Sequence, residues 1–437
     1  MKSNARVKFI TLGCKVNQYE TQGMREIMER AGVREENTPG TSARPCDFVV
    51  INTCTVTREA DKENHYWIRR ARRENPQARI VVTGCYVEKN RASLESLPEV
   101  DLILSNAEKH HLAERLMTGC GSPAVQTARH QYAPLSISRS AGRARAFVKI
   151  QDGCNHGCSF CKVVLVRGRS RSRELTDIID EVKRLRDSGY HEIVLAGIQL
   201  GAYGLDLEKE NGLVDVLEAC ARIDGIERLR LSSIEPMDVR DPLIRTLRGL
   251  SKCCHHLHIP LQCGDDEILR RMNRRYTRSY YLDLIAHLRE ELTDFSLTLD
   301  VMAGFPGEEE RHFQNTVDLL ETVRPLKCHV FPYSRREGTR AAHFVDCPDK
   351  VIRERVRCLI AQGDRLGAEE RKRYEGRVFP VLVEKKTRGL VQGMTANYLK
   401  VCFQAEENAV GNIFPVELLT LQGDLFLGRI RNKEGGH

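Results

Sequence analysis

Three cysteines, Cys154, Cys158 and Cys161, restrict most what this chain can fold into, because their C-x3-C-x2-C spacing brings three thiols into one short loop. This loop triad follows residues 146–151, an apolar run that we predict to be a strand. Structural zinc normally takes four protein ligands, and the loop offers only His156 as a fourth. Iron–sulfur cubanes are held by cysteine thiolates, ordinarily four. Three thiolates would therefore leave one iron open to a small molecule.

Strand-like and helix-like stretches alternate through the first part of the chain. The expected strands are short apolar runs at residues 7–12, 47–52, 79–83 and 101–104. Strand–helix alternation predicts a parallel α/β sheet with helices on both faces. We expect an N-terminal domain over residues 1–118 and an aperiodic linker over residues 119–142.

Cys14, Cys54 and Cys85 form a second, dispersed set, here called the sheet-edge triad. Each follows the end of a predicted strand. In parallel sheets, ligands gather outside the carboxyl ends of the strands. We therefore expect the three thiols to meet at one edge and to share a metal. A buried structural cysteine explains one such position well and three poorly.

The rest of the chain predicts two further domains. Six strand candidates alternate with amphipathic helices over residues 143–374, which favours a partial (βα)6 TIM-like barrel with its chemistry at the strand C-terminal ends. Short β-rich runs over residues 375–437 predict a small antiparallel β-barrel, a shape often used to bind oligonucleotides. The fold class is thus α/β with a C-terminal β module.

Composition favours a cytoplasmic protein with a polyanionic partner. Lys and Arg outnumber Asp and Glu by 68 to 60, a formal charge of +8, which suits nucleic acid without establishing it. We find no export signal and no apolar run long enough to span a membrane, so we expect a cytoplasmic location. Sixteen cysteines in a reducing compartment indicate metal ligands, catalytic thiols or buried small hydrophobes rather than disulfides.

The two triads and their flanking motifs resemble the radical S-adenosylmethionine (SAM) methylthiotransferases. The motifs are Gly-Cys-Lys-Val-Asn-Gln-Tyr at 13–19, Asn-Thr-Cys at 52–54, Gly-Cys-Tyr at 84–86, Leu-Ser-Ser-Ile-Glu-Pro at 231–236 and Gly-Phe-Pro-Gly-Glu at 304–308. The C-terminal module resembles the TRAM domain that these enzymes use on RNA. The resemblance covers essentially the whole chain, with the motifs in the same order.

The resemblance implies two 4Fe–4S clusters, a radical-generating cluster on the loop triad and an auxiliary cluster on the sheet-edge triad. SAM would chelate the open iron of the first cluster and be split to methionine and a 5′-deoxyadenosyl radical. One SAM would methylate a sulfur on the auxiliary cluster. Another would supply the radical that removes hydrogen from C2 of a substrate adenine, which then takes the methylthio group.

The run at 13–19 and Phe-Pro-Tyr-Ser at 331–334 resemble the motifs of one branch of this family. That branch modifies N6-threonylcarbamoyladenosine beside the tRNA anticodon. The implied partners are the tRNA anticodon stem-loop, an electron donor such as flavodoxin or ferredoxin, and a sulfur donor. One alternative is the same chemistry on N6-isopentenyladenosine or on an aspartate of a ribosomal protein. An alternative of another class is a non-catalytic, zinc-containing RNA-binding protein.

Further residues are candidates for SAM and RNA contacts. In the resembled family, strand-end positions surround SAM, and here they are Gly197, Gln199, Ser232, Glu235, Gln262 and Gly304. Turn formation by the glycines and capping by Ser232 are equally good explanations. The basic run contributes Arg167, Arg169, Arg171 and Arg173 as candidates to grip RNA phosphates, which would make binding salt-dependent. A solvated loop is the alternative for this run.

Several positions depart from the family pattern. Residues 162–165, Lys-Val-Val-Leu, stand where two aliphatic residues, proline and an aromatic are common. Cys263 replaces a usual serine, Leu299 a frequent threonine, and Arg-Arg-Glu at 335–337 a proline-containing turn. Because both triads are intact, we expect the chemistry to be retained while cluster environment, SAM fit or substrate preference differ.

Overall fold

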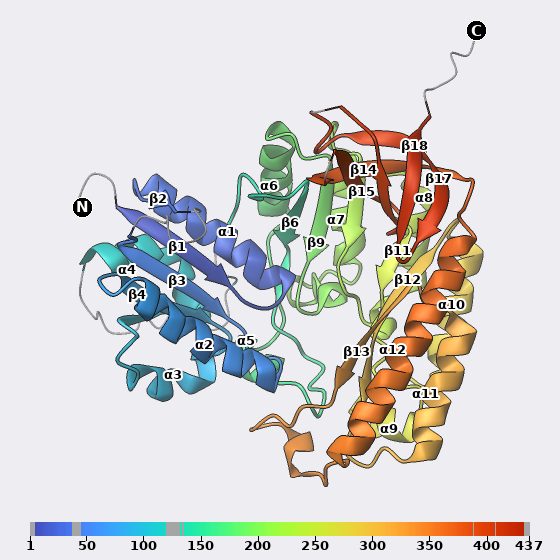
Figure 1. Cartoon of the computed structure of the whole chain (residues 1–437), viewed down its shortest axis with the longest axis horizontal. Coiled ribbons are helices and arrows are strands. Elements are labelled where there is room, and N and C mark those ends of the chain that lie inside the picture. Colours follow the sequence, from blue (N-terminus) through green and yellow to red (C-terminus); the bar gives the residue numbers. More distant parts are fainter. Residues whose placement is uncertain are drawn as a thin grey trace.

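The computed structural model describes residues 5–36, 45–118, 132, 135–387, 389–406 and 408–431. Three parts follow one another along the chain, an N-terminal sheet with helices, a larger central α/β part and a C-terminal sheet (Figure 1). In these ranges no helix is both long and apolar enough to cross a membrane.

The N-terminal part is a five-stranded parallel sheet in the order β2-β1-β3-β4-β5. Its strands are β1 (Arg6–Thr11), β2 (Arg34–Glu35), β3 (Phe48–Thr53), β4 (Arg79–Gly84) and β5 (Leu102–Ile103). Its helices are α1 (Lys15–Arg30), α2 (Arg58–Glu74), α3 (Val87–Glu95), the 3-10 helix η1 (Asn106–His111) and α4 (Leu112–Thr118). Apolar side chains of α2 and α3 cover one face of the sheet, and those of α1 and α4 cover the other. This arrangement confirms the predicted parallel sheet.

The central part contains six parallel strands in two three-stranded sheets, β10-β9-β6 and β11-β12-β13. The strands are β6 (Arg145–Lys149), β9 (Glu192–Ala196), β10 (Arg228–Leu231), β11 (His256–His258), β12 (Ser296–Ala303) and β13 (Lys327–Pro332). Parallel bridges from Leu229 to Cys253 and from Ser233 to His258 link the two sheets. All six strands were predicted within a few residues.

Helices cover the outside of these central strands. The long ones are α6 (Leu175–Asp187), α7 (Gly212–Ala221), α8 (Asp241–Gly249), α10 (Arg278–Glu291), α11 (Glu310–Val323) and α12 (Asp349–Lys372). Shorter elements are β7 (Gln151–Asp152), α5 (Val163–Arg167), β8 (Arg171–Ser172) and α9 (Asp266–Arg271). Figure 1 shows α10, α11 and α12 side by side along the outer side of β12 and β13. The largest hydrophobic core of the molecule lies between these helices and strands.

The C-terminal sheet closes on itself in the order β14-β15-β16-β18-β17. Its strands are β14 (Val378–Thr387), β15 (Leu390–Thr395), β16 (Lys400–Phe403), β17 (Ile413–Gln422) and β18 (Leu425–Ile430). The expectation of a wholly antiparallel module is wrong in one pairing, because β16 and β18 run parallel. The sequence does not predict β15, since Gln392 and Gly393 interrupt its apolar pattern.

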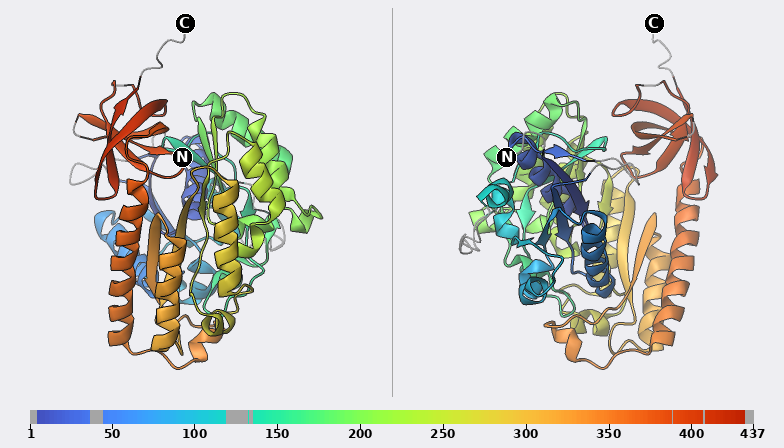
Figure 2. Two further views of the ribbon diagram at one scale, coloured as in Figure 1. Left: turned by 90° about the vertical axis from the view of Figure 1, so that its right-hand side faces the viewer. Right: turned by 60° about the vertical axis from the view of Figure 1, so that its left-hand side comes forward.

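The C-terminal sheet lies at the end of α12 (Figure 2). Buried arginines of the central part form hydrogen bonds with it. Arg228 donates to the carbonyl oxygen of Pro380 at 2.6 Å, and Arg230 donates to that of Ala396 at 2.9 Å. The carboxylate of Glu192 accepts from Arg230 at 2.7 Å. The C-terminal sheet is therefore docked through polar contacts rather than tethered only by the chain.

Candidate active site

The sheet-edge triad meets at the carboxyl edge of the N-terminal sheet, as its spacing predicts. Cys14, Cys54 and Cys85 come after the adjacent strands β1, β3 and β4. A methyl group on Gly13 would lie only 2.7 Å from the sulfur of Cys54, so the first two loops are in contact. Asn17 ties them further by donating to the carbonyl oxygens that precede each cysteine loop, at 2.7 and 3.0 Å.

The loop triad lies between β7 and α5, where backbone geometry shapes it. Gly153 has φ +74°, and a methyl group there would lie 2.0 Å from the carbonyl oxygen of Arg169. Only glycine fits such a position, because the left-handed region and the close approach both exclude a side chain. The loop also closes through a hydrogen bond from the Cys154 amide to the Gly168 carbonyl at 3.1 Å.

Donors surround the sulfurs of the loop triad. The amide of His156 donates to Cys154 Sγ and the amide of Val163 to Cys161 Sγ, both at 3.4 Å. Arg274 reaches Cys158 Sγ at 3.3 Å through Nη1 and also pairs with Glu235. Hydrogen bonds of this kind stabilise thiolates, and in iron–sulfur centres they tune the reduction potential.

Both triads contribute to one cavity of about 240 Å³. All three sheet-edge cysteines line it, together with Cys161 of the loop triad. Its apolar lining includes Phe160, Val163, Val166, Ile198, Met302, Phe331 and Tyr333. Its polar lining includes Lys162, Gln262, Asp300 and Arg336. The fold thus joins two cysteine sets from different parts of the chain in one largely apolar space.

The thiols suit a metal cluster. Burial raises the pKa of Cys54 and Cys161 to about 12 and that of Cys154 to about 11. Metal binding would therefore have to displace their protons. Among the described residues, no three His, Cys, Asp or Glu side chains are placed to share one ion. Iron–sulfur clusters are held by cysteine thiolates, the type of ligand that both triads offer.

The side chain of Arg167 is buried, with only 1% of its surface exposed, whereas a contact with RNA phosphates requires an exposed guanidinium. Its Nε donates to Cys85 Sγ at 3.1 Å, and Nη2 donates to the side-chain oxygen of Asn17 at 2.7 Å. Its Nη1 contacts Glu20 at 2.8 Å and Asp152 at 3.1 Å. Its burial between the N-terminal and central parts leaves the guanidinium almost no exposed surface for the predicted contact with RNA phosphates.

Arg167 belongs to a buried network of charges that joins the two parts. Glu20 of α1 also pairs with Lys109 and, at 2.7 Å, with Lys149 of β6. Lys149 in turn pairs with Asp152 at 2.7 Å. Paired and hydrogen-bonded charges of this kind are the form in which buried ions are tolerated. Three cations thus surround two carboxylates, and the guanidinium at their centre reaches a sheet-edge thiol.

The other arginines of the basic run divide by position. Arg173 is buried and pairs with Glu181 at 3.1 Å, so it too has little exposed surface for the predicted RNA contact. Arg171 is half-buried near Asp152 at 3.6 Å. Arg169 is exposed, which leaves its predicted role open.

The six residues predicted to contact SAM are spread along the strand ends. Gln199 accepts a hydrogen bond from the Asn155 amide within the loop triad at 2.9 Å, and Gln262 lines the shared cavity. Ser232 has a buried hydroxyl with no hydrogen-bond partner among the described residues. Glu235 pairs with the arginine that contacts Cys158.

The two glycines have structural explanations. A methyl group on Gly197 would lie 2.9 Å from Oε1 of Gln151. Gly304 has φ +76° and abuts Ile352. Close packing and a left-handed turn thus account for glycine at these positions.

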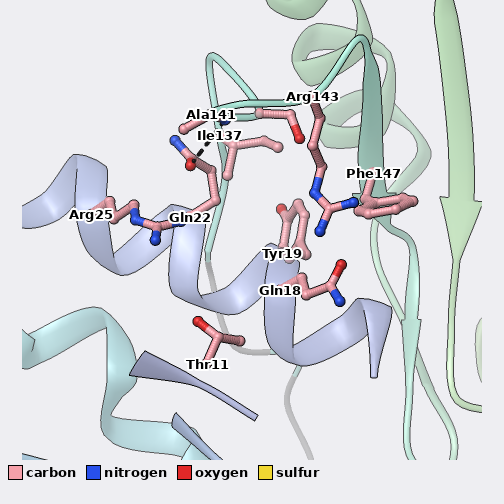
Figure 3. A pocket seen from close by; sticks show the side chains of 10 residues that line it. Thr11, Gln18, Tyr19, Gln22, Arg25, Ile137, Ala141, Arg143 and Phe147 are labelled. Atoms are coloured by element: carbon pink, nitrogen blue, oxygen red, sulfur yellow. Dashed lines mark hydrogen bonds between the residues drawn. The ribbon is translucent and has the colours of Figure 1, made fainter. Parts of the chain in front are cut away.

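A second pocket, of about 280 Å³, lies between α1 and the segment that leads into β6 (Figure 3). Figure 3 shows the guanidinium of Arg143 beside the ring of Phe147, 5.1 Å from its centroid. Gln22 accepts from the Ala141 amide at 3.3 Å. None of the six triad cysteines lines this pocket, which marks the joint between the two parts rather than the cysteine cavity.

Sequence reasoning missed Glu20, Asn17, Arg274 and the cavity positions of Lys162 and Arg336. Asn17 lies in the motif at 13–19 and Glu20 directly follows it, so their spacing of about one helical turn, just after Cys14, was the signal that could have identified them. Arg274 lies in a basic stretch, and the sequence does not distinguish it from Arg270, Arg271 and Arg275.

Comparisons with known proteins agree with this site. Residues 148–320 match the model of the Radical SAM superfamily, and residues 6–105 match that of Uncharacterized protein family UPF0004. Among solved structures, the radical S-adenosylmethionine methyltransferase TsrM from Kitasatospora setae aligns with a TM-score of 0.55 at 15% identity. The alignment covers 78% of this chain and 77% of that one, and it shows a shared fold.

Curated relatives match nearly end to end. Threonylcarbamoyladenosine tRNA methylthiotransferase MtaB of Bacillus subtilis is 38% identical over 95% of this chain and 94% of its own length. tRNA-2-methylthio-N(6)-dimethylallyladenosine synthase of Carboxydothermus hydrogenoformans is 33% identical over 95% and 97%. The chain therefore belongs to the radical SAM methylthiotransferase family, in the branch of the MtaB-named enzymes, and uses SAM and two 4Fe–4S clusters.

Proposed function

We propose that the protein adds a methylthio group to C2 of N6-threonylcarbamoyladenosine, 3′ to the anticodon in tRNA. The observation that carries the proposal is the single cavity lined by the sheet-edge triad and by Cys161 of the loop triad. Methylthiolation requires sulfur delivery and radical formation on either side of one C–H bond. The MtaB name of the Bacillus subtilis relative supports the choice of nucleoside.

We assign the loop triad to the radical-generating cluster and the sheet-edge triad to the auxiliary cluster. SAM would supply the radical and the methyl group, and the two clusters would supply the electron and the sulfur. The chain's part is to hold the reacting groups and exclude water. Arg274 and two backbone amides orient the loop sulfurs, and Arg167 orients Cys85. The apolar cavity wall shields the reaction from solvent, and fixed positions reduce the entropy lost on reaction.

SAM would lie beside the loop triad, along the strand ends of an incomplete (βα)6 barrel formed by the two linked sheets. Gln199, Ser232 and Gln262 are the candidates that we retain for this role. Gln199 already contacts the loop, Ser232 has an unused hydroxyl, and Gln262 faces the cavity.

Three regions divide the work in this proposal. Residues 1–118 hold the auxiliary cluster, residues 143–374 form the radical SAM domain, and residues 375–437 form a TRAM-like module that binds RNA. The closed C-terminal sheet supports the last assignment, because closed β modules commonly bind oligonucleotides. Flavodoxin or ferredoxin as reductant and a separate sulfur donor remain predictions.

An anaerobic assay with synthetic anticodon stem-loops tests the proposal. Reconstituted protein, SAM and reductant are incubated with RNAs that carry threonylcarbamoyladenosine, isopentenyladenosine or unmodified adenosine, and nucleosides are identified by mass spectrometry. We expect the methylthio product from the first RNA. Preferential modification of the isopentenyl RNA would overturn the substrate assignment. A colourless protein that binds zinc and cleaves no SAM would overturn the enzyme assignment.

A further inference from the structure

Two cations line the cysteine cavity at positions where the sequence departs from the family pattern. Lys162 follows Cys161 directly, and Arg336 lies in the turn after β13. The Arg336 guanidinium lies close enough to the Lys162 ammonium for the two charges to repel each other. The lining of the cavity therefore includes the positive side chains of Lys162 and Arg336 as well as the sheet-edge cysteines.

The hydrogen-bonding capacity of these cations is only partly used. Arg336 is buried, and its Nη2 donates to Asp61 at 2.5 Å and to the Thr55 carbonyl oxygen at 3.0 Å. Its Nε is buried and has no hydrogen-bond partner among the described residues. Across the same ranges, no hydrogen bond or ion pair of the half-buried Lys162 ammonium is found.

Three carboxylates surround the pair. Asp61 is the carboxylate bonded to Arg336, and Glu337 is an exposed anion close to Lys162. Asp300, which also lines the cavity, is bonded to His258 at 3.1 Å. Asp61 and Asp300 are thus already paired, whereas the ammonium of Lys162, a residue that lines the cavity, has no hydrogen bond or ion pair among the described residues. Buried donors without partners are costly, so the site favours an anionic ligand.

We propose that Lys162 and Arg336 bind the carboxylate of the substituent on N6 of the substrate adenine. This inference rests on the proposed function and deepens it. The threonylcarbamoyl group ends in a carboxylate, whereas an isopentenyl group is uncharged and would leave both cations without a partner. Charge-assisted hydrogen bonds are strong and geometrically specific. A site built to bond such a group discriminates against a substrate that lacks it.

Binding measurements on the holoenzyme test the inference. Two fluorescent anticodon stem-loops are compared by anisotropy, one with threonylcarbamoyladenosine and one in which its carboxylate is converted to a methyl amide. We expect the wild type to bind the acid about 10- to 100-fold more tightly. The Lys162→Met variant should lose most of this preference through weaker binding of the acid. Its affinity for the amide should change less than about threefold.

Lys162→Met is the main variant because Arg336 also holds Thr55 and Asp61 together, so its removal affects folding. Arg336→Lys keeps the charge and removes Nε, and we expect it to lower the preference as well. Lys89→Met is the matched control, because Lys89 is an exposed cation close to Lys162 that does not line the cavity. It should retain the full preference.

Different experimental outcomes would overturn the carboxylate site and the proposed function. Equal binding of acid and amide by the wild type would overturn the carboxylate site, even if the methylthio product still forms. Loss of SAM cleavage or iron content in Lys162→Met would overturn it too, because the cation would then serve SAM or the cluster. Product formed only from the isopentenyl RNA would overturn the proposed function.

Discussion

The two cysteine triads are built in opposite ways. The sheet-edge triad gathers residues from three separate strand ends, and it depends on a pairing of strands that are far apart in sequence. The loop triad lies within eight residues and is shaped by local turns and backbone donors. One site is a product of tertiary structure, and the other is largely a product of local chain geometry.

The difference extends to the supporting charges. Arg167 contacts Cys85 and is itself held by Glu20 and Asp152, which come from different parts of the molecule. Arg274 contacts Cys158 and is held by Glu235 within the central part. Docking of the two parts is therefore a condition for the sheet-edge environment but not for the loop environment. Each prediction below tests this asymmetry.

The largest expected effect separates the two chemistries. Cys158→Ala should reduce SAM cleavage to background, a loss of about 10³-fold or more, because the cluster that we assign to the loop triad would lose a ligand. Cys85→Ala should retain SAM cleavage and lose methylthiolation. The measurements are 5′-deoxyadenosine release and nucleoside mass spectrometry on the same samples. Loss of SAM cleavage in both variants would contradict independent roles for the triads.

Removal of Arg167 should destabilise the joint between the parts. In Arg167→Met, Glu20 and Asp152 lose a buried partner, and we expect a loss of about 3–5 kcal/mol in the free energy of unfolding. Arg169→Met is the matched control from the same run, because Arg169 is exposed, and it should change stability by less than about 0.5 kcal/mol. Urea denaturation of the metal-free variants measures both. Similar stabilities would show that the network is unimportant.

Much of this architecture follows from the sequence. The length and the mainly apolar character of two short segments identify β3 and β4. Phe48–Thr53 and Arg79–Gly84 are continuous runs that are buried on both faces of the sheet. Parallel pairing then fixes Cys54 and Cys85 at one edge. Glycine next to cysteine marks the exposed turns. The placement of these cysteines at the ends of the strands, which depends on such short-range rules, was therefore predictable.

Partners across the joint were not predictable. Arg167 and Arg169 are two residues apart in one basic run, yet one is buried and the other is exposed. Their difference comes from the approach of α1, which supplies Glu20 and Asn17 to Arg167. No local pattern encodes that approach. The shared cavity depends on the same docking and was likewise not predictable from a local pattern.

The Gly13→Ala variant tests whether the sheet-edge triad depends on the close contact between the loops that carry Cys14 and Cys54. A methyl group there would meet the Cβ and Sγ of Cys54 at 2.7 Å, so Gly13→Ala should displace this thiol. We expect about four irons per chain instead of about eight, with SAM cleavage retained. Gly32→Ala is the matched control, because Gly32 also has positive φ (+80°) but has nothing within 4 Å. The Gly32→Ala variant should lose only about 1–2 kcal/mol of stability through backbone strain, and it should retain about eight irons per chain.

The smallest expected effect is a pH dependence of the network. Burial raises the pKa of Glu20, but Arg167, Lys109 and Lys149 outweigh it and hold that pKa well below the usual value. A lowered pKa in the folded state stabilises the protein above the unfolded value of about 4.3, and this contribution is lost as the pH falls through the folded value. Glu20→Gln should therefore cost about 1.5–3 kcal/mol at pH 7 and progressively less below about pH 4.

Urea denaturation of the metal-free protein at several pH values measures this difference. Glu29→Gln on the same helix is the control, because Glu29 forms a surface pair with Arg139 and should change stability by at most about 1 kcal/mol at each pH. A Glu20→Gln penalty that stays constant down to pH 3 would contradict a charge-based joint. The two parts would then be held by packing around Tyr19 and Leu135, and the sheet-edge environment would no longer depend on ionised groups.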